Sequence, residues 1–457
     1  SNGWRGCGGR AEGHRGGGRR RAGNGPGRGC GGGGQAGHIC LRYRLGRRPL
    51  NTGGQHFVLV AGEASGDVLG ARLIAALRQR HMEAGGAGGA GGDIVFSGVG
   101  GALMAAEGLN SLFPIADLSV MGLAEILPRL RLLLRRLAET AAHVRAVRPT
   151  ALITIDAPGF SFRLAKRLAG EGIPLIHYVA PQVWAWRPGR ARHLAGQIDH
   201  LLALLPLEPD FFSDYDLPCE FVGHPVIEGV AEMPGDGPGF RQQHDIPTDA
   251  PIIAMLPGSR VGEVRRLLPV FVQVAALLQA RHADLQIIIP TVEQVTSLVR
   301  EAVVSWPMKT HVIEGQSGRA DAFATADAAL AASGTVSLEL ALRGVPTVVA
   351  YRTNPITASL VRRMLTIPYV ALPNILAKAP VMPEFLQEKC QPQPIADALA
   401  KLLDDPEQRG VQQKQFTHIA KILGQGALAP SLRAADAVQK IVEVGSVAGV
   451  EPTALTL

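Results

Sequence analysis

Several residues that could do chemistry come directly after short apolar runs of the sequence. Asp156 is the clearest case, because it ends the apolar run 151–155. In open parallel sheets, ligands bind beyond the carboxyl ends of the strands, so the Asp156 carboxylate is expected to face a cleft. A partly desolvated carboxylate there can accept the proton of an attacking hydroxyl group. The alternative is a cap on the helix expected near Phe160, which Pro158 and Gly159 disfavour because they separate Asp156 from that helix.

Two glycine-containing loops precede Asp156, at residues 61–67 and 97–101, and each joins an apolar run to a helical segment. Glycine allows a tight turn, and the amides at a helix N-terminus can meet an anion or a sugar hydroxyl. The alternatives are an ordinary turn with Asp67 as helix cap, and close helix–sheet packing at the glycines. Neither loop has the G-x-G-x-x-G pattern, which disfavours a nicotinamide-dependent oxidoreductase. The candidate contacts to a sugar substrate are Glu63, Ser65, Gly66 and Gly100.

The second half of the chain has two loops of the same kind, at residues 256–260 and 332–339. Both place small polar residues between an apolar run and a helix start, where the helix dipole and exposed amides favour an anion. Arg260 can hold phosphate oxygens in bidentate fashion, and Glu339 can accept hydrogen bonds from two ribose hydroxyls. Helix capping is the alternative for the hydroxyl residues, and no Walker lysine pattern indicates a P-loop. The predicted nucleotide contacts are Ser259, Arg260, Ser333, Gly334, Thr335 and Glu339.

These loops need elements that position them, and the sequence alternates short apolar runs with segments of helical period. Strands separated by helices indicate βαβ units and a parallel sheet. This alternation of strands and helices is interrupted by a stretch rich in Pro and Gly and then resumes. The sequence therefore predicts an α/β fold of two Rossmann-like parallel-sheet domains facing a cleft. The expected strands are 57–60, 94–96, 151–155, 174–179, 200–205, 220–222, 252–256, 285–289, 311–313, 328–331 and 346–350. The expected parts are a tail at 1–54, an N-terminal domain at 55–228, a linker at 229–250, a C-terminal domain at 251–430 and a helical end at 431–457.

The first 50 residues contain 18 glycines and 11 arginines with a single acidic residue, Glu12. The formal net charge of +7 therefore comes from this segment, and the rest of the chain is slightly acidic. A segment so rich in glycine cannot bury enough apolar surface to fold, so we predict a disordered Gly/Arg-rich tail. An RNA-binding arm is one interpretation. An over-extended start site or an expression artefact is favoured, because regularly interleaved aromatic residues are missing, and no apolar segment of a secretory signal follows the arginines.

Residues 121–147 have a helical pattern that combines an apolar face with arginines. Such a helix can rest on an anionic membrane surface, and Arg129, Leu132 and Arg136 are the predicted membrane contacts. The alternative is a helix that faces the core and has a solvated basic side. Trp184 and Trp186 could stack on a sugar or anchor at an interface, or belong to the core. The residues expected on the core face of the helix are Leu123, Ile126, Leu130, Leu133, Leu137, Ala141 and Val144.

The composition excludes several classes of protein. No apolar run approaches the roughly 18–20 residues that span a bilayer, which excludes an integral membrane protein. Five cysteines in 457 residues exclude a disulfide scaffold, and no Cys/His spacing indicates a zinc site.

The candidate loops other than the one at 97–101 belong to a set of eight motifs that follow one another along the chain. They are VAGEASGD (60–67), SVMG (119–122), IDAP (155–158), HYVAPQVWAWR (177–187), LPGSR (256–260), ASGT (332–335), LPN (372–374) and EFLQ (384–387). Together, from about residue 56 to residue 442, they strongly resemble the lipid-A-disaccharide synthase family. So many motifs in the expected order are far more specific than any one of them. Residues 1–54 have no counterpart.

The resemblance implies a GT-B glycosyltransferase fold without a metal or another cofactor. The family joins UDP-2,3-diacylglucosamine to 2,3-diacylglucosamine 1-phosphate, which forms the β-linked lipid A disaccharide 1-phosphate and releases UDP. By resemblance, Asp156 is the general base on the acceptor's primary hydroxyl group. The residues that the resemblance places on the UDP side are Arg260, Glu339, Asn374, Gln387 and the turn Ser333-Gly334-Thr335.

The resemblance also implies a peripheral enzyme at the cytoplasmic face of the bacterial inner membrane, where both acylated sugars reside, with no nucleic-acid partner. A homodimer stays open. Two other functions are kept as alternatives. A UDP-sugar 2-epimerase of the same architecture would need further carboxylates and a histidine in the cleft. An RNA-binding protein would depend on the arm at residues 1–54.

Overall fold

The computed structural model describes residues 54–85, 92–119, 123–186, 188–354, 358, 364 and 367–447. The side chains of residues 123–127, 186 and 445–447 are outside this description. The predicted tail therefore lies outside the described residues except for Gly54, and so do the side chains of Leu123, Ile126 and Trp186.

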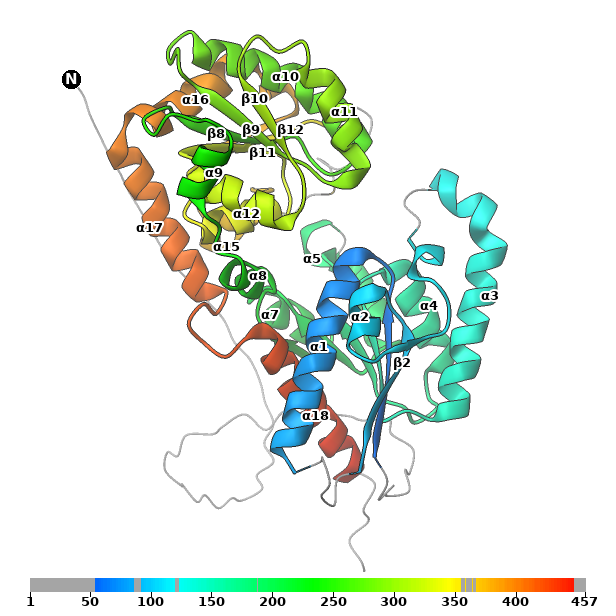
Figure 1. Ribbon diagram of the computed structural model, residues 1–457. Coiled ribbons are helices and arrows are strands. Elements are labelled where there is room, and N and C mark those ends of the chain that lie inside the picture. Colours follow the sequence, from blue (N-terminus) through cyan, green and yellow to red (C-terminus); the bar gives the residue numbers. More distant parts are fainter. Residues whose placement is uncertain are drawn as a thin grey trace, which may run out of the picture. The chain divides into compact units, whose positions relative to one another are not determined.

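A seven-stranded parallel sheet occupies the first half of the described chain (Figure 1). Its strand order is β3-β2-β1-β4-β5-β6-β7, so the chain adds β2 and β3 on one side of β1 and then returns to place β4 on the other. The gap between β1 and β4 is thus the topological switch point of the sheet, where ligands bind in open parallel sheets. The strands are β1 (Gln55–Ala61), β2 (Ile94–Val99), β3 (Asn110–Ser111), β4 (Ala151–Ile155), β5 (Leu175–Tyr178), β6 (His200–Ala203) and β7 (Cys219–Phe221).

Helices cover both faces of this sheet, which explains why its central strands are apolar on both sides. One buried cluster lies under α1 and contains Leu73 and Leu77, and the other lies under α3 and α4 and contains Val144 and Leu164. The helical elements of this half are α1 (Ala64–Glu83), α2 (Ala102–Ala106), η1 (Ile115–Asp117), α3 (Leu123–Val147), α4 (Pro158–Leu168), α5 (Val183–Trp186), η2 (Pro188–Arg190), α6 (Ala191–Ala195) and α7 (Glu208–Ser213).

The second half builds a six-stranded parallel sheet with the order β10-β9-β8-β11-β12-β13. Its switch point lies between β8 and β11, because β9 and β10 extend one side and β11 to β13 the other. Two parallel-sheet α/β domains, as predicted, are therefore confirmed. The elements are β8 (Ile252–Leu256), α10 (Val261–Gln279), β9 (Gln286–Pro290), α11 (Glu293–Val303), β10 (Thr310–Ile313), α12 (Gln316–Thr325), β11 (Ala328–Ala331), α13 (Val336–Leu342), β12 (Thr347–Tyr351), α15 (Leu372–Ala377), β13 (Glu384–Leu386), η3 (Gln387–Lys389), α16 (Pro392–Asp404) and α17 (Pro406–Ile422).

The last helix, α18 (Pro430–Val447), returns to the first sheet and lies alongside α1, as Figure 1 shows. Ala434 and Val438 are fully buried in the cluster under α1. The end of the chain therefore completes the core of the first sheet.

The stretch predicted as a linker, residues 229–250, contains helical structure: it begins within α8 (Val226–Glu232) and includes α9 (Gly237–Gln243). Glu228 of α8 accepts hydrogen bonds from the amide and hydroxyl group of Ser431, and its carboxylate lies 3.9 Å from the Arg72 guanidinium. α8 is therefore tied to α1 and to the start of α18.

Element boundaries differ from the predictions at the candidate loops. α1 begins at Ala64 rather than near Asp67, and α4 begins at Pro158 rather than near Phe160. The short strands β3 and β13 were not predicted. Each has two or three residues and none of the apolar runs that mark the central strands.

A glycine in β2 provides a test of the sheet. Gly98 has a φ of 137°, and a Cβ there would lie 1.9 Å from the Leu59 carbonyl oxygen of β1. We expect Gly98→Ala to lower the free energy of unfolding by about 3 kcal/mol or more, because both the φ angle and the strand contact are violated. Gly410 in α17 has open space around its Cβ position. Gly410→Ala should leave the thermal midpoint equal or higher, and an equal loss in both variants would contradict this account.

Candidate active site

The loops that follow β1 and β4 meet at the switch point of the first sheet. Ala61 and Ile155 are paired in register, so the residues directly after them lie side by side. A Cβ on Gly62 would come within 2.4 Å of the Ala157 Cβ. Glycine at position 62 is therefore required by the close approach of the two loops.

Asp156 follows β4 in an uncommon backbone conformation. Its φ is 50° and that of Ala157 is 47°, so two consecutive non-glycine residues adopt the left-handed region, which costs about 1–2 kcal/mol each. The Asp156 amide donates to the Tyr178 carbonyl at 2.9 Å, and the Ser161 hydroxyl donates to the Asp156 carbonyl at 2.7 Å. The N-cap of α4 is Ala157. Asp156 is therefore held by a strained turn and does not occupy the N-cap position.

The acid–base properties of this turn depend on a second carboxyl group. Burial raises the pKa of the Asp156 carboxyl, and the amide of Ala157 lowers it by a smaller amount. The pKa of Glu63, the N-cap residue of α1, is raised by burial first and by the Asp156 charge second, while the Arg260 guanidinium lowers it. Two carboxyl groups of increased proton affinity thus interact with each other. A raised pKa brings a general base closer to the optimum for accepting a proton at neutral pH.

Asp67 caps a helix, but not the one considered as the alternative for its loop. Its buried carboxylate accepts hydrogen bonds from the amides of Gly101 at 2.8 Å and of Leu103 and Met104 at 3.1 Å. Asp67 therefore caps α2 from within the first turn of α1, and the alternative in which it is the N-cap of α1 is wrong, because that position is held by Glu63.

The four predicted sugar contacts of the first half divide into two groups. A Cβ on Gly66 would lie 3.2 Å from the Ala61 Cβ, and one on Gly100 would lie 2.6 Å from Leu109. Packing thus accounts for both glycines. Glu63 is partly exposed and Ser65 is exposed, so both can meet a ligand.

The second switch point carries the predicted anion loops. Leu256 of β8 pairs with Ala331 of β11, so Ser259 and Arg260 come from the loop next to the turn at 333–335. Arg260 is the N-cap of α10, and its side chain is 64% exposed with Nη1 3.5 Å from the Glu263 carboxylate. An exposed guanidinium beside the amides of a helix start is suited to a phosphate group.

The turn Ser333-Gly334-Thr335 joins β11 to α13, with Thr335 as N-cap. Gly334 and Thr335 are exposed, whereas the Ser333 hydroxyl donates to the Val370 carbonyl at 3.2 Å. The turn is therefore open to a ligand on one side and tied to the segment before α15 on the other.

Two of the side chains predicted to contact UDP form ion pairs or hydrogen bonds with other residues of the protein. The carboxylate of Glu339 pairs with Arg319 through one oxygen and with Arg343, at 3.5 Å, through the other. Asn374 is fully buried, and both its amide nitrogen and its oxygen bond to the chain. Both side chains thus lie in internal hydrogen-bond or ion-pair networks, and their contact with UDP stays a prediction. Gln387 is partly exposed and accepts from the Thr353 amide at 3.3 Å.

Trp184 belongs to the core, in a cluster that also contains Leu205 and Leu338. Its indole nitrogen donates to Glu208 at 3.2 Å, and the Glu208 carboxylate accepts from the amides of Leu204 and Leu205 as well. Burial raises the pKa of Glu208 to about 7, and these donors oppose the rise. Glu208 was not among the residues predicted from the sequence. The only available signal was its place after β6 in the segment LPLEP.

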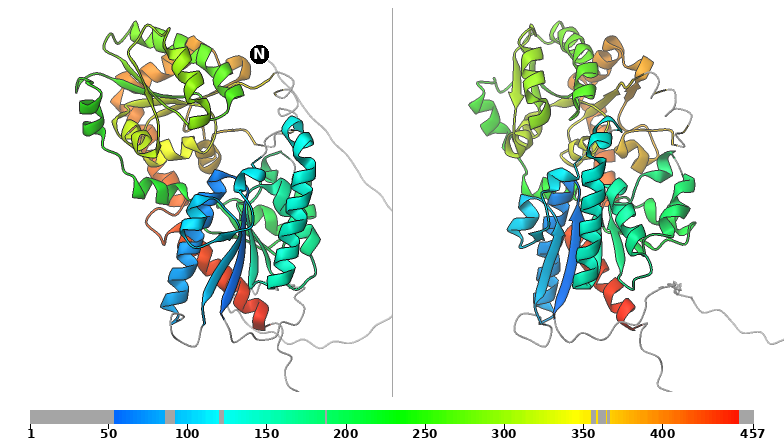
Figure 2. Two further views of the ribbon diagram at one scale, coloured as in Figure 1. Left: turned by 45° about the vertical axis from the view of Figure 1, so that its right-hand side comes forward. Right: turned by 90° about the vertical axis from the view of Figure 1, so that its right-hand side faces the viewer.

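The basic helix α3 differs from its predicted orientation over the described residues 128–135. Leu130, predicted to face the core, is 47% exposed, and Leu134 is also 47% exposed. The amino-terminal part of α3 extends beyond the neighbouring helices (Figure 2), and within it Leu133 still packs against the buried cluster under α3 and α4 while Leu130 does not. Arg129 is exposed and Leu132 half-buried. Arg136 pairs with Asp117 and Glu139 and lies over the Phe113 ring, which leaves it less free to meet a lipid headgroup.

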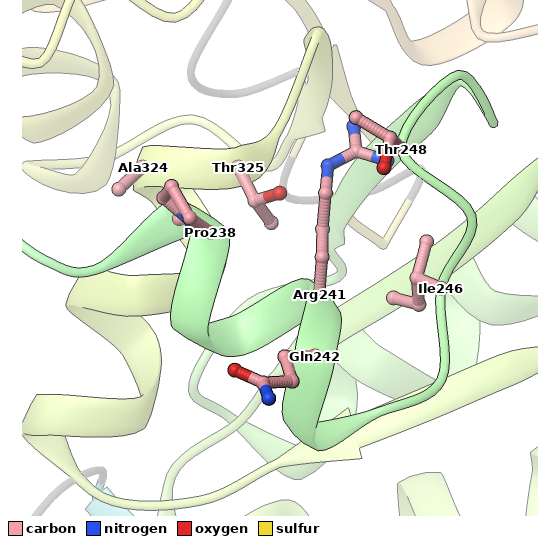
Figure 3. Close-up of a pocket in the computed structure, with 8 residues that line it drawn as sticks. Pro238, Arg241, Gln242, Ile246, Thr248, Ala324 and Thr325 are labelled. Atoms are coloured by element: carbon pink, nitrogen blue, oxygen red, sulfur yellow. The ribbon is translucent and has the colours of Figure 1, made fainter.

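A cavity lies apart from these loops. This cavity, of about 480 Å³ between α9 and α12, is lined by Gln242 and Thr325 among others, and Arg241 spans it in Figure 3. It contains none of the predicted site residues.

Within the described ranges, no group of three or more His, Cys, Asp or Glu side chains could hold a metal ion. Over the same part of the chain, every helix is too short or too polar to cross a bilayer.

Comparison with known proteins decides the family. The family model described as lipid-A-disaccharide synthetase matches residues 57–438. The chain belongs to the lipid-A-disaccharide synthase family. It is 52% identical over 386 residues to the lipid-A-disaccharide synthase of Rhodospirillum centenum, covering 84% of this chain and 94% of the relative. The synthase of Paramagnetospirillum magneticum is 46% identical over 391 residues, which cover 85% and 97% of the two chains.

Solved structures share the fold of this family member. The calicheamicin glycosyltransferase CalG4 matches with a TM-score of 0.51 and 17% identity, over 85% of this chain and 98% of its own. The UDP-GlcNAc 2-epimerase of Neisseria meningitidis matches with a TM-score of 0.56 and 12% identity, over 85% and 99%. These likenesses confirm the GT-B architecture. They do not separate a transferase from an epimerase, whereas the family match favours the transferase.

The buried carboxyl of Glu208 makes stability depend on pH. Because its pKa is raised from 4.5 to about 7, the unfolded chain loses this proton before the folded chain does, and the free energy of unfolding falls as pH rises through that interval. We expect the stability of the wild type relative to that of Glu208→Gln to fall by on the order of 3 kcal/mol between pH 4.5 and pH 8, because glutamine does not titrate. Denaturant unfolding at several pH values measures this. A difference independent of pH would contradict the assignment.

Proposed function

We propose that this family member is the inverting glycosyltransferase that joins UDP-2,3-diacylglucosamine to 2,3-diacylglucosamine 1-phosphate. The products are the β-linked lipid A disaccharide 1-phosphate and UDP. The family match over residues 57–438 carries the proposal. The positions of Asp156 and Arg260, each at the switch point of its own sheet, support it.

Asp156 acts as the general base. Its carboxylate takes the proton from the primary hydroxyl group of the acceptor sugar as that oxygen attacks the anomeric carbon of the donor. The bond between the anomeric carbon and the diphosphate oxygen breaks on the opposite face, so the configuration inverts and no covalent intermediate forms. Burial, which raises the pKa of Asp156, increases its affinity for this proton.

The departing UDP gains negative charge as that bond breaks, and the second sheet supplies positive charge. The exposed Arg260 guanidinium and the start of α10, next to Ser259, contact the diphosphate. The exposed turn at Gly334 and Thr335 completes this side. Glu63, which is partly exposed, and Ser65, which is exposed, face the acceptor sugar.

Both substrates carry acyl chains, so the enzyme has to reach a lipid surface. The part of α3 from Arg129 to Arg135 combines exposed arginines with the exposed side chains of Leu130 and Leu134. Basic residues attract anionic headgroups, and leucines enter the boundary with the acyl chains. This surface docks the enzyme peripherally on the cytoplasmic face of the inner membrane.

Asp156→Asn tests the base. The amide cannot accept the hydroxyl proton, so turnover should fall about 100- to 10,000-fold while UDP binding is retained. The assay measures UDP release with both acylated sugars, and calorimetry measures UDP affinity.

Asp199→Asn is the matched control, because Asp199 is another aspartate whose pKa is raised by burial, and it accepts from the Leu175 amide at the amino end of the same sheet. This variant should keep its turnover. Undiminished turnover in Asp156→Asn would exclude Asp156 as the base.

The double variant Leu130→Glu with Leu134→Glu tests membrane docking. Each leucine contributes about 1.5–3 kcal/mol when fully buried, so the loss of both should reduce binding to vesicles of anionic lipid at least tenfold. Val411 of α17 is 52% exposed, and Val411→Glu serves as the control that should sediment with vesicles like the wild type. Equal sedimentation of all three proteins would count against docking through α3.

A further inference from the structure

Asn374 belongs to a family motif, and yet it has no atom left for a ligand. Its side-chain nitrogen donates to the Met382 carbonyl and to Glu384, each at 2.8 Å. Its side-chain oxygen accepts from the Met382 amide at 2.7 Å. Both N–H donors of the amide group are thus used, and the residue is fully buried. Any effect of Asn374 on the reaction has to pass through its partners.

Glu384, the first residue of β13, is the partner on which the hydrogen bonds converge. Its carboxylate accepts from the amides of Val370, at 3.2 Å, and Ala371, at 2.9 Å, in addition to Asn374. Hydrogen bonds to a charged acceptor are stronger than neutral ones, at about 1.5–3 kcal/mol each. Glu384 therefore fixes the backbone directly before α15.

The fixed backbone in turn holds the nucleotide turn. The Val370 carbonyl accepts the Ser333 hydroxyl at 3.2 Å. With its one hydrogen directed at Val370, the Ser333 oxygen keeps its lone pairs available. An unbroken series of contacts therefore runs from Asn374 through Glu384 and Val370 to Ser333.

The position of β13 at the edge of the sheet allows Glu384 to contact both α15 and the backbone before it. β13 is the edge strand of its sheet, and Glu384 pairs with Val349 of β12. Three residues later, Gln387 accepts from the Thr353 amide at 3.3 Å. β13 and the residue directly after it thus hold the chain where it leaves β12 and where it enters α15.

We propose that Glu384 is a positioning residue for the UDP half of the donor site. It holds Val370 and Ala371 so that the Ser333-Gly334-Thr335 turn is ordered before UDP binds, and Asn374 orients the Glu384 carboxylate. This inference rests on the proposed function, in which that turn contacts UDP. Preorganisation of this kind strengthens binding, because the ordering cost is met in the free protein.

The test compares UDP affinity by calorimetry and the KM of the UDP-sugar in Glu384→Gln, Glu384→Ala and Ser333→Ala. Glu384→Ala should weaken UDP binding about tenfold or more and raise KM more than it lowers kcat. Glu384→Gln keeps the shape and one acceptor oxygen, so it should fold like the wild type and show a smaller loss of affinity. The double variant with Glu384→Ala and Ser333→Ala should bind UDP no more weakly than the weaker-binding single variant, since both residues act through Val370.

Asp327→Ala is the control for a purely structural effect. Asp327 accepts from the Ile252 amide at 2.8 Å, at the amino end of the same sheet. This variant should lose thermal stability without a change in UDP affinity. The proposal is overturned if both Glu384→Gln and Glu384→Ala lose thermal stability without a change in UDP affinity, as expected for Asp327→Ala. It is also overturned if the losses of UDP affinity in the double variant are additive.

Failure of the proposed function gives a different result. In that case Arg260→Ala, which leaves the Glu384 network intact, would bind UDP as tightly as the wild type. Weaker UDP binding in Arg260→Ala together with unchanged binding in both Glu384 variants would overturn only the positioning role.

Discussion

The close approach of two loops at the switch point between β1 and β4 is the constraint on which the position of the proposed general base depends. Gly62 and Ala157 can touch only because position 62 has no side chain. The contact accompanies two left-handed residues after β4, and the strain of that turn is offset by the hydrogen bonds of Asp156 to Tyr178 and Ser161. The outcome is a carboxyl group that is directed by backbone geometry and is partly removed from water.

The second sheet repeats this topology with the opposite charge. Its switch-point loops present an exposed arginine and an exposed small-residue turn where the first sheet presents carboxyl groups. The difference suits the proposed reaction, in which the first sheet removes a proton and the second stabilises a departing diphosphate. Nearby polar residues divide into those exposed to a ligand, such as Arg260 and Thr335, and those that shape the backbone, such as Glu339 and Asn374.

Burial explains why these two roles are difficult to separate from motifs alone. Asn374 and Arg260 both lie in short motifs of polar and small residues, and resemblance assigns both to the UDP side. One is fully buried with every donor used, whereas the other is 64% exposed. A buried polar group has to be bonded within the protein, so its importance is expressed through the atoms that it holds.

The sequence by itself determined the alternation of strands and helices, the two sheets and the loops that carry Asp156, Arg260 and Ser333. It could do so because apolar runs buried on both faces are a strong local signal, and because glycine and small polar residues mark the strand ends. It did not determine that Leu130 faces solvent, since a helical pattern does not show where the underlying core ends. The capping of α2 by Asp67 and the convergence on Glu384 were decided only by the tertiary structure. These contacts join residues that are adjacent in space but separated along the chain, and no local periodicity encodes such a pairing.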